Sequence, residues 1–298
     1  MLDYSALAAL AAVIRAGSFE AAARALFVTP SAVSQRIRLL EEKIGCALVV
    51  RGQPCLPTPA GRRLCQHVEH VRLLEHQLQD SVPGLALDAA ERVALPIAVN
   101  ADSLATWLAP ALAAFGAAQP VLIEVAVDDQ DHTGEWLRTG AVMAAVTGTA
   151  RAAAGCNSRA LGAMRYLAAA SPALIARYFA DGVDGASLAR APSLLFNTKD
   201  ELQARWAHGV CGRAVELPRH VLPSSEAFVT AALAGMGWAM HAQQLIAAHL
   251  ADGTLVELVP GSHLDVPLYW HSARAASTLL DGLSQTIVNA ANAALLPP

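Results

Sequence analysis

The segment TPSAVSQRIRLLEEKIG, residues 29–45, carries polar side chains with the types and spacing that nucleic-acid binding needs. Ser31 lies four residues before Gln35, so both belong to one face of a helix. Ser34 and Arg38 share a face for the same reason. A helix that enters the major groove of DNA needs short donors and acceptors near its N-terminus and longer ones a turn later. The alternative is an ordinary solvated helix face, on which Ser31 serves only as a helix cap.

A second group of candidate residues is acidic and lies further along the chain. Asp128, Asp129 and Asp131 fall within four residues, and such a cluster suits an ammonium or guanidinium group. The segments NADS (100–103) and PSSEAF (223–228) each begin a predicted helix, where free backbone N–H groups suit a carboxylate. These patterns predict a binding site for a small charged molecule.

The full set of candidate ligand contacts is Asn100, Asp102, Ser103, Trp107, Asp128, Asp129, Asp131, Thr147, Asn197, Lys199, Asp200, Ser224, Ser225 and Glu226. Trp107, Trp238 and Trp270 could stack on an aliphatic stem or a guanidinium group. The alternatives are that the polar residues are helix caps and that the tryptophans belong to the core.

Three helices and a hairpin are expected to position the first group. Helical spacing of apolar residues predicts a helix over about residues 3–16, and Gly17-Ser18 separates it from a second helix. The third helix begins near Thr29 and ends at Gly45. Its expected buried stripe consists of Val33, Ile37, Leu40 and Ile44. Two short helices joined by a tight turn indicate a helix-turn-helix.

The segment ALVVRGQPCLPT predicts a small β-hairpin, or wing, and Thr58-Pro59 begins a long helix that reaches about residue 80. An apolar seam near heptad spacing predicts a coiled-coil-like dimer contact along that helix. The seam consists of Leu64, Val68, Val71, Leu74 and Leu78.

Strands and helices alternate from residue 93 onwards, which predicts an α/β fold with a largely parallel sheet. Two such sets are followed by a strand at 266–273 and a final helix over about 277–295. This order predicts two lobes joined by crossing strands. A ligand of such a fold lies between the lobes, beyond the carboxyl ends of the strands.

Composition and charge separate the two parts. Residues 1–80 carry a net charge of +2 and residues 81–298 a net charge of −6, which favours a DNA-binding head on a body with another task. The five cysteines form no CxxC pair, so neither a disulfide framework nor a metal site is expected, and a reducing cytoplasm fits best. No uninterrupted apolar run has the length that spans a membrane. The chain has no GxSxG, HExxH, P-loop or GxGxxG pattern in the right context, and we expect no enzyme activity.

The run GSFEAAARALFVTPSAVSQRIRLLEEKIGCALVVR, followed by PTPAG, closely resembles the N-terminal domain of LysR-type transcriptional regulators over roughly residues 3–80. The remainder resembles the effector-binding domain of that family. The segments NADSLATWLAPAL, DDQDHTGEWLRTGAVMAAVTG, MRYLAAASP, PSSEAFVTAALAGMGWAM and LDVPLYWH are similar to its ArgP/LysG branch, also described as an inhibitor of chromosome replication initiation. Members of that branch respond to lysine or arginine and control genes such as basic amino-acid exporters.

The resemblance implies an all-α winged helix-turn-helix domain (1–58), a linker and dimerisation helix (59–80), a hinge (81–90) and a two-lobed effector domain (91–298). This last domain has a periplasmic-binding-protein-like type II fold, with lobe I at about 91–162 and 266–298 and lobe II at about 163–265. The implied DNA contacts are Ser18, Pro30, Ser31, Ala32, Ser34, Gln35, Arg36, Arg38, Arg51, Thr58 and Arg62. Among these, Ser18, Arg51, Thr58 and Arg62 are expected to contact phosphates, which set register without specifying sequence.

The expected partners are double-stranded DNA at dyad-related sites, further copies of the chain in a dimer or tetramer, and RNA polymerase. No cofactor is expected beyond a small-molecule effector, lysine or arginine, with Asp102 and Asp129 recognising its charged groups. The alternatives are a LysR-type regulator with another effector, an architectural DNA-binding role without an effector, and a non-regulatory solute-binding protein. The helix-turn-helix pattern and an N-terminus without a signal-peptide pattern count against the last of these.

Overall fold

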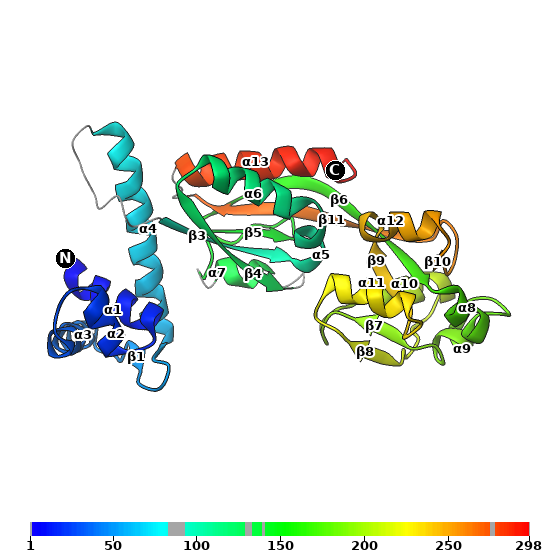
Figure 1. Ribbon diagram of the computed structural model, residues 1–298, viewed down its shortest axis with the longest axis horizontal. Helices are drawn as coiled ribbons and strands as arrows, with labels where there is room; N and C mark the ends of the chain where they lie inside the picture. The colour runs from blue at the N-terminus through cyan, green and yellow to red at the C-terminus, as the bar shows by residue number, and fades with distance from the viewer. Residues whose placement is uncertain (1, 83–92, 129–132, 139–140, 275–277, 298) are drawn as a thin grey trace.

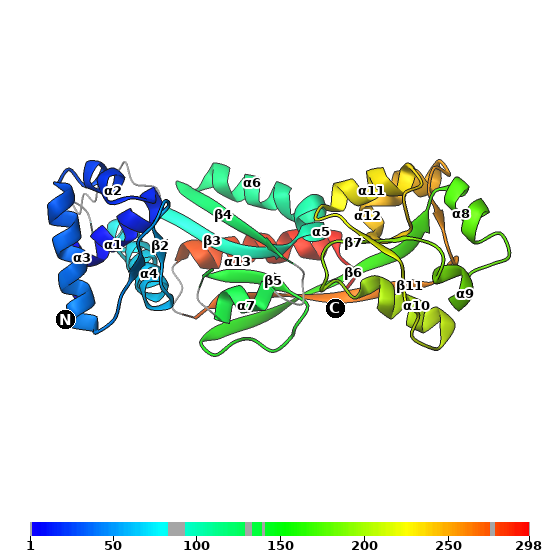
Figure 2. The same ribbon diagram turned by 90° about the horizontal axis from the view of Figure 1, so that it is seen from below.

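The computed structural model describes residues 2–82, 93–128, 133–138, 141–274 and 278–297. The molecule is elongated, and both views show an N-terminal head with a long helix, then a lobe built on a large sheet, then a second lobe (Figures 1 and 2).

The head is a helix-turn-helix with a wing, as the sequence predicts. Its elements are α1 (Tyr4–Ala16), α2 (Phe19–Ala25), α3 (Pro30–Ile44), β1 (Val49–Val50), β2 (Leu56–Pro57) and the long α4 (Pro59–Ser81). The helix boundaries follow from local capping. Asp3 caps α1 by accepting hydrogen bonds from two backbone N–H groups, and Gly17 and Gly45 end α1 and α3 in the left-handed conformation. β1 and β2 pair antiparallel to form the wing.

The buried stripe of α3 is shorter than predicted. Val33, Ile37 and Leu40 are buried in the core of the head, whereas Ile44 is 39% exposed. The prediction that Ile44 is buried is therefore wrong. Ile44 is the last residue of the helix and lies beyond the part that packs on α1 and α2.

Two polar contacts fasten the parts of the head to each other. The Glu41 carboxylate accepts hydrogen bonds from the N–H groups of Leu48 (2.7 Å) and Val49 (3.3 Å), and it thereby holds the wing against α3. The Arg15 guanidinium donates to the Glu69 carboxylate at 2.9 Å, which links α1 to α4.

A mixed sheet of order β10-β6-β11-β5-β3-β4, with β9 also paired to β6, extends through both lobes, and β9 and β10 lie in the second lobe (Figure 1). The strands of this sheet are β3 (Val93–Asn100), β4 (Val121–Asp128), β5 (Ala144–Thr147), β6 (Cys156–Ala170), β9 (Ala239–Ala242), β10 (Val256–Glu257) and β11 (His263–Ala273). Among the described pairs of this sheet, only β3 with β4 and β3 with β5 are parallel. The predicted largely parallel sheet is therefore wrong, because β6 and β11 run in opposite directions between the lobes and the strands beside them pair antiparallel.

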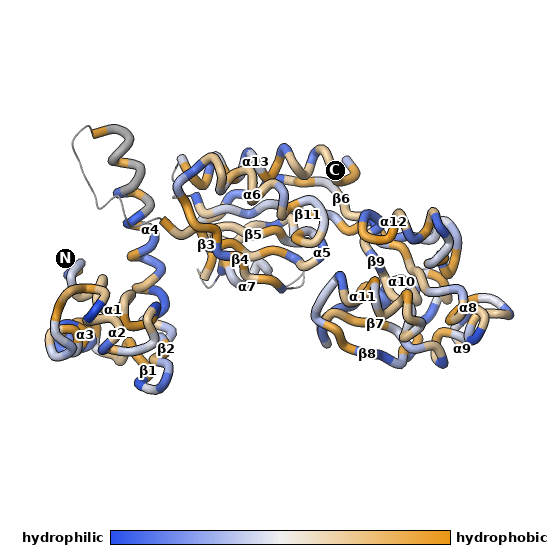
Figure 3. The backbone as a smooth tube through the Cα atoms, in the orientation of Figure 1, coloured by the Kyte–Doolittle hydropathy of each residue, from blue (hydrophilic) through white to orange (hydrophobic). Residues whose placement is uncertain are grey.

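Helices cover both faces of this sheet (Figure 1). After β3 the chain forms α5 (Ala101–Ser103), a π-helical turn η1 (Leu104–Leu108) and α6 (Ala109–Ala118); α7 (Thr133–Arg138) and α13 (Thr278–Ala294) complete the first lobe. Pro110 has no N–H to donate to the carbonyl four residues earlier, which favours the wider π-helical turn. The alternate residues Leu95, Ile97 and Val99 of β3 are buried in the main core, which also takes apolar residues of α6 and α13. Figure 3 shows apolar residues concentrated along β3 and β5 and hydrophilic ones along much of α4.

The second lobe contains α8 (Pro172–Tyr178), α9 (Gly185–Leu188), β7 (Ser193–Leu195), α10 (Leu202–Cys211), β8 (Arg219–Val221), α11 (Ser225–Leu233) and α12 (Gln243–Ala251). The buried rings of Trp206 and Trp238 lie 5.3 Å apart at its centre. The paired strands β6 and β11 join it to the first lobe, and their register shifts between Leu268 and Tyr269. The sequence predicts this arrangement of two lobes joined by crossing strands.

Candidate functional site

The exposed face of α3 presents most of the predicted base-reading residues. The side chains of Ser31, Gln35 and Arg38 are exposed, together with Pro30, while Ala32, Ser34 and Arg36 are half-buried. Arg38 lies 3.8 Å from the carboxylate of Glu42, one turn further on, in an exposed ion pair of little strength. The guanidinium is therefore available to a stronger anionic partner.

Three residues near the predicted DNA contacts are helix caps. Ser18 and Thr29 accept hydrogen bonds from the backbone N–H groups of Ala21 and Ala32. Thr58 accepts one from Gly61 and donates to the carbonyl of residue 47. The capping roles are observed, and the phosphate contacts expected for Ser18 and Thr58 stay predictions.

The two remaining phosphate candidates lie on the wing and α4. Arg51 is exposed, and its guanidinium lies 5.3 Å from the centre of the Phe19 ring, a cation–π contact that holds the wing near α2. Arg62 is exposed in the first turn of α4.

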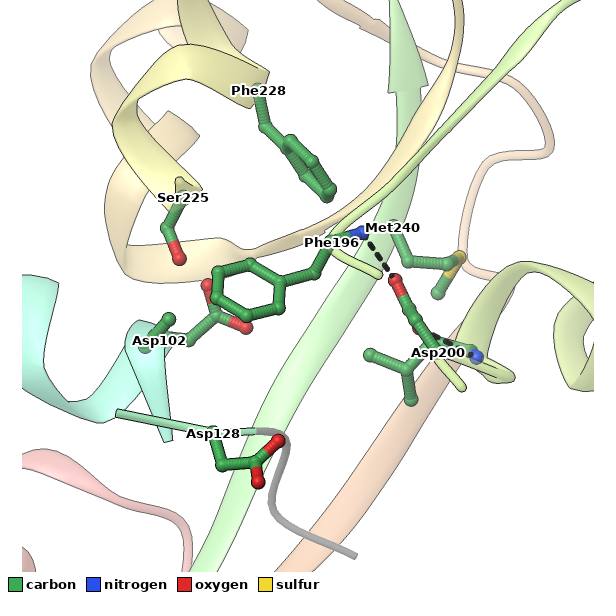
Figure 4. Close-up of a pocket in the computed structure, with 9 residues that line it drawn as sticks. Asp102, Asp128, Phe196, Asp200, Ser225, Phe228 and Met240 are labelled. Carbon is green, nitrogen blue, oxygen red and sulfur yellow. Dashed lines mark hydrogen bonds between the residues drawn. The ribbon is translucent and has the colours of Figure 1, made fainter. Parts of the chain in front are cut away.

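A pocket with about 350 Å³ of empty space, part of it open to solvent, lies where the two lobes meet (Figure 4). α5 and the end of β4 contribute residues from the first lobe. The second lobe contributes residues from three places: the loop before α10 with the first residue of that helix, α11, and β9. The lining consists of Ala101, Asp102, Asp128, Phe196, Asp200, Leu202, Ser225, Phe228 and Met240.

Asp102 lies at the centre of the interactions in this pocket. The Tyr166 hydroxyl donates to its Oδ2 at 2.8 Å, and Ser225 from α11, which points towards it in Figure 4, also hydrogen-bonds the carboxylate. Burial raises the pKa of Asp102 above its ordinary value; the bonds from Ser225 and Tyr166 oppose this rise, and the negative charge of Asp200 adds to it. Among the described residues, none of the groups that shift the pKa of Asp102 is a cation.

The other two carboxylates are held in place by N–H donors. Asp200 accepts from the backbone N–H groups of Phe196 (3.0 Å) and Leu202 (3.1 Å), so it shapes the loop before α10 (Figure 4). Asp128 accepts from the indole Nε1 of Trp136 at 3.2 Å. Both carboxylates line the pocket with Asp102, and together they make it acidic.

The apolar part of the lining comes from Phe196, Leu202, Phe228 and Met240. Carboxylates beside apolar side chains suit a ligand with a cationic end and an aliphatic stem. Sequence reasoning did not name these apolar residues as contacts. The one local signal for them was the position of Phe228 one helical turn after Ser225, on the same face of α11.

The structure brings together four of the predicted ligand contacts, namely Asp102, Asp128, Asp200 and Ser225, from four separate segments. Other candidates have local roles or face solvent. Asn197 accepts a bond from the backbone N–H of Lys199, whose side chain is exposed. Ser224 caps α11, and Glu226 is exposed.

Asn100, Ser103 and Thr147 are buried at the ends of β3, α5 and β5 and do not belong to the lining of this pocket. The carboxamide of Asn100 and the hydroxyl of Ser103 have no hydrogen-bond partner among the described residues. Asp129 and Asp131 lie outside the described residues.

The tryptophans that could have stacked on a ligand are core residues. Trp107, Trp238 and Trp270 are all buried in the main core, and the Nε1 of Trp270 donates to Ser284 at 2.8 Å. Their burial favours the core role that the sequence left open as the alternative; the rings do not line this pocket, and a stacking role stays a prediction.

Neither a metal-binding cluster nor a single membrane-spanning helix is found among the described residues. No group of three or more His, Cys, Asp or Glu side chains is arranged to hold a metal ion there. In the same residues no single helix is long and apolar enough to cross a membrane, and only the pair α1 and α2, bent by 119° at their junction, meets the criteria of length and composition together.

Comparison with known proteins identifies the family. Residues 4–62 match the model of the bacterial regulatory helix-turn-helix protein, lysR family, and residues 90–292 match the LysR substrate binding domain. The HTH-type transcriptional regulator ArgP of Pseudomonas aeruginosa is 47% identical over 291 residues, which cover 97% of this chain and 95% of that protein.

Solved structures agree with this match. The crystal structure of ArgP from Mycobacterium tuberculosis superposes with a TM-score of 0.85 at 42% identity and covers 100% of both chains. Full-length LysG from Corynebacterium glutamicum with bound effector Arg superposes with a TM-score of 0.73 at 36% identity, covering 99% of this chain and 100% of that one. The first family model matches the helix-turn-helix head and the second matches the two-lobed body. This chain therefore belongs to the LysR family of transcriptional regulators.

Proposed function

We propose that this regulator binds promoter DNA through its head and that arginine or lysine, bound between the lobes, controls it. The observation that carries the effector assignment is the half-buried Asp102 carboxylate, which shares an acidic pocket with Asp128 and Asp200. The relative LysG from Corynebacterium glutamicum, which holds Arg as its effector, supports the same ligand class.

The electrostatics of the pocket favour a cation. Because burial raises the pKa of Asp102, its charged form is less stable there than in water. A guanidinium or ammonium group beside the carboxylate would stabilise the charged form, and the aliphatic stem would lie against Phe196 and Phe228. Binding of the cation would therefore lower the pKa of Asp102 again.

Residues from both lobes line the pocket. A ligand that contacts the two lobes at once therefore stabilises the arrangement in which the lobes face each other across the pocket. In this scheme residues 1–58 select the DNA site, residues 59–80 pair with a second copy, and residues 91–298 hold the effector. The ligand acts by changing the arrangement of the domains, and through it the spacing of the heads on DNA.

Exposed apolar side chains support self-association to a dimer or tetramer. Leu74 and Leu78 of α4 are each about half exposed. Leu122, Val125 and Val127 are exposed on β4, which is an edge strand of the main sheet. Two such surfaces on different domains would allow one pairing through the helices and another through the lobes. RNA polymerase is the further partner we expect, and the cytoplasm the location.

Calorimetric titration of arginine and lysine into Asp102→Asn tests the effector assignment. We expect about a 10- to 100-fold loss of affinity, because a hydrogen bond to a charged group contributes about 1.5–3 kcal/mol. Citrulline, a neutral analogue of arginine, should bind the unaltered protein more weakly than arginine does. Asp181→Asn, at an exposed position of the second lobe, is the matched control.

Unchanged arginine and lysine affinities in Asp102→Asn, or equal binding of citrulline and arginine, would show that the pocket does not recognise a basic amino acid. If the protein binds neither arginine nor lysine but still selects specific duplexes from a random-sequence DNA pool, it is either a regulator with another effector or an architectural DNA-binding protein without one. Arg38→Ala should weaken binding to those duplexes at matched salt.

A further inference from the structure

Phe27, in the turn between α2 and α3, has no structural role that explains its side chain. It is 96% exposed, the most exposed of the large hydrophobic residues that the structure describes. It is also the one non-glycine residue in the described part of the chain with a positive φ, +53°. An apolar ring in water and a left-handed backbone are both unfavourable for phenylalanine.

The turn itself explains the backbone conformation but not the ring. The N–H groups of Leu26 and Val28 donate to the carbonyls of Ala22 and Ala23 at 3.0 Å, and the N–H of Phe27 donates to Arg24 at 3.3 Å. This is the closure by which helices end on a left-handed residue, a position where glycine or asparagine is normally found. Glycine would make the same hydrogen bonds with less strain, so neither the turn nor the core of the head requires the phenyl ring.

We propose that the Phe27 ring is a DNA contact, packing against deoxyribose and thymine-methyl surfaces beside the N-terminus of α3. The inference rests on the proposed DNA-binding function and adds to it an apolar contact from the turn. Phe27 precedes by two residues Thr29, the N-cap of α3, and it is followed by the exposed residues Pro30 and Ser31. The exposed ring therefore comes immediately before the N-terminus of the helix that we propose contacts DNA, and the exposed Arg24 nearby suits a phosphate-lined surface.

An apolar contact has a different signature from a phosphate contact. A lysine or arginine that neutralises a phosphate releases counterions, so its loss lowers the salt dependence of binding. Removing a phenyl ring that covers sugar and methyl groups lowers affinity but leaves the number of released ions unchanged. Phe27 and Arg62 can thus be distinguished by the slope of affinity against salt.

The test compares Phe27→Gly, Phe27→Asn and Phe27→Leu with the unaltered full-length protein. The probe is a duplex that the unaltered protein selects from a random-sequence pool, and affinity is measured by fluorescence anisotropy at several salt concentrations. We expect Phe27→Gly and Phe27→Asn to bind about five- to tenfold more weakly at every salt concentration with the same slope, the loss set by the apolar area uncovered. Phe27→Leu should recover part of the affinity, and Arg62→Ala should reduce the slope by about one.

Folding controls are built into these substitutions. Glycine and asparagine suit the left-handed turn, so the thermal midpoints of both variants should equal or exceed that of the unaltered protein. Val221→Ala, at an exposed apolar position of the second lobe, should not change DNA affinity. Full affinity of Phe27→Gly at all salt concentrations, including a case in which only self-association or polymerase binding is lost, would overturn the DNA contact. Failure of the unaltered protein to select any duplex would instead overturn the proposed function.

Discussion

Acid should destabilise the second lobe through His241. This residue of β9 is 2% exposed, its ring meets the Phe228 ring edge-on at 6.4 Å, and its Nε2 has no hydrogen-bond partner in the described part of the chain. Burial, assisted by the nearby His249, lowers the pKa of His241 from 6.5 to about 4. The folded protein therefore favours the neutral ring, whereas the unfolded chain protonates at its ordinary value.

The size of the effect follows from proton linkage. Because the folded-state pKa lies below the unfolded value, the stabilising contribution is complete above about pH 6.5 and is lost as the pH falls towards 4. The two pKa values give a loss of about 2 kcal/mol between pH 7 and pH 5, and about 3 kcal/mol by pH 4. Asp102, whose pKa is raised, acts in the opposite direction, so comparison with a variant is needed to isolate His241.

Urea unfolding of the unaltered protein and of His241→Gln, followed by tryptophan fluorescence at pH 7 and pH 5, measures this contribution. His241→Gln should lose about 2 kcal/mol less than the unaltered protein between these pH values, whatever its stability at pH 7. His208→Gln, at an exposed position of the same lobe, should follow the unaltered protein. Equal losses in His241→Gln and the unaltered protein would refute the assignment of acid sensitivity to this buried ring.

Three further substitutions test the packing of the fold, each by urea denaturation. Ile37→Ala should destabilise the head by about 2–5 kcal/mol, because the side chain is buried at the centre of the core and its removal leaves a cavity. Gly162→Ala should lower the free energy of unfolding by more than about 1 kcal/mol, because φ is +122° and a Cβ would overlap a carbonyl oxygen of the C-terminal segment. Gly253→Ala should lower it by less, because φ is +75° and the space around this position is open. Asp265→Asn removes the paired hydrogen bonds from Arg165, both 2.8 Å, and should cost less than about 1 kcal/mol because the pair is one-third exposed. A loss above 2 kcal/mol for Asp265→Asn, or none for Ile37→Ala, would contradict this ranking.

The head could be predicted from the sequence almost completely, because its signals are local. Caps at Ser18, Thr29 and Thr58 and the left-handed glycines that end α1 and α3 act within a few residues of the backbone groups they satisfy. The periodic apolar residues then determine which face of each helix is buried. Only Ile44 departed from the pattern, since burial depends on what packs against a position as well as on its spacing.

The two lobes were predictable as elements but not as a sheet. Alternation in β3 predicted a strand, and the order of strands and helices predicted an α/β fold. Strand direction, however, depends on which strands become neighbours, and β6 and β11 decide this by crossing between the lobes in opposite directions. No local pattern encodes that pairing.

The acidic pocket shows the same division between sequence and tertiary structure. The sequence alone determined that carboxylates and hydroxyls stand at strand ends and helix starts. It could not determine that Asp102, Asp200 and Ser225 meet while Lys199 faces solvent, because side chains from distant segments come together only when both lobes are folded. The raised pKa of Asp102 is likewise a tertiary property, since burial and the neighbouring Asp200 charge produce it.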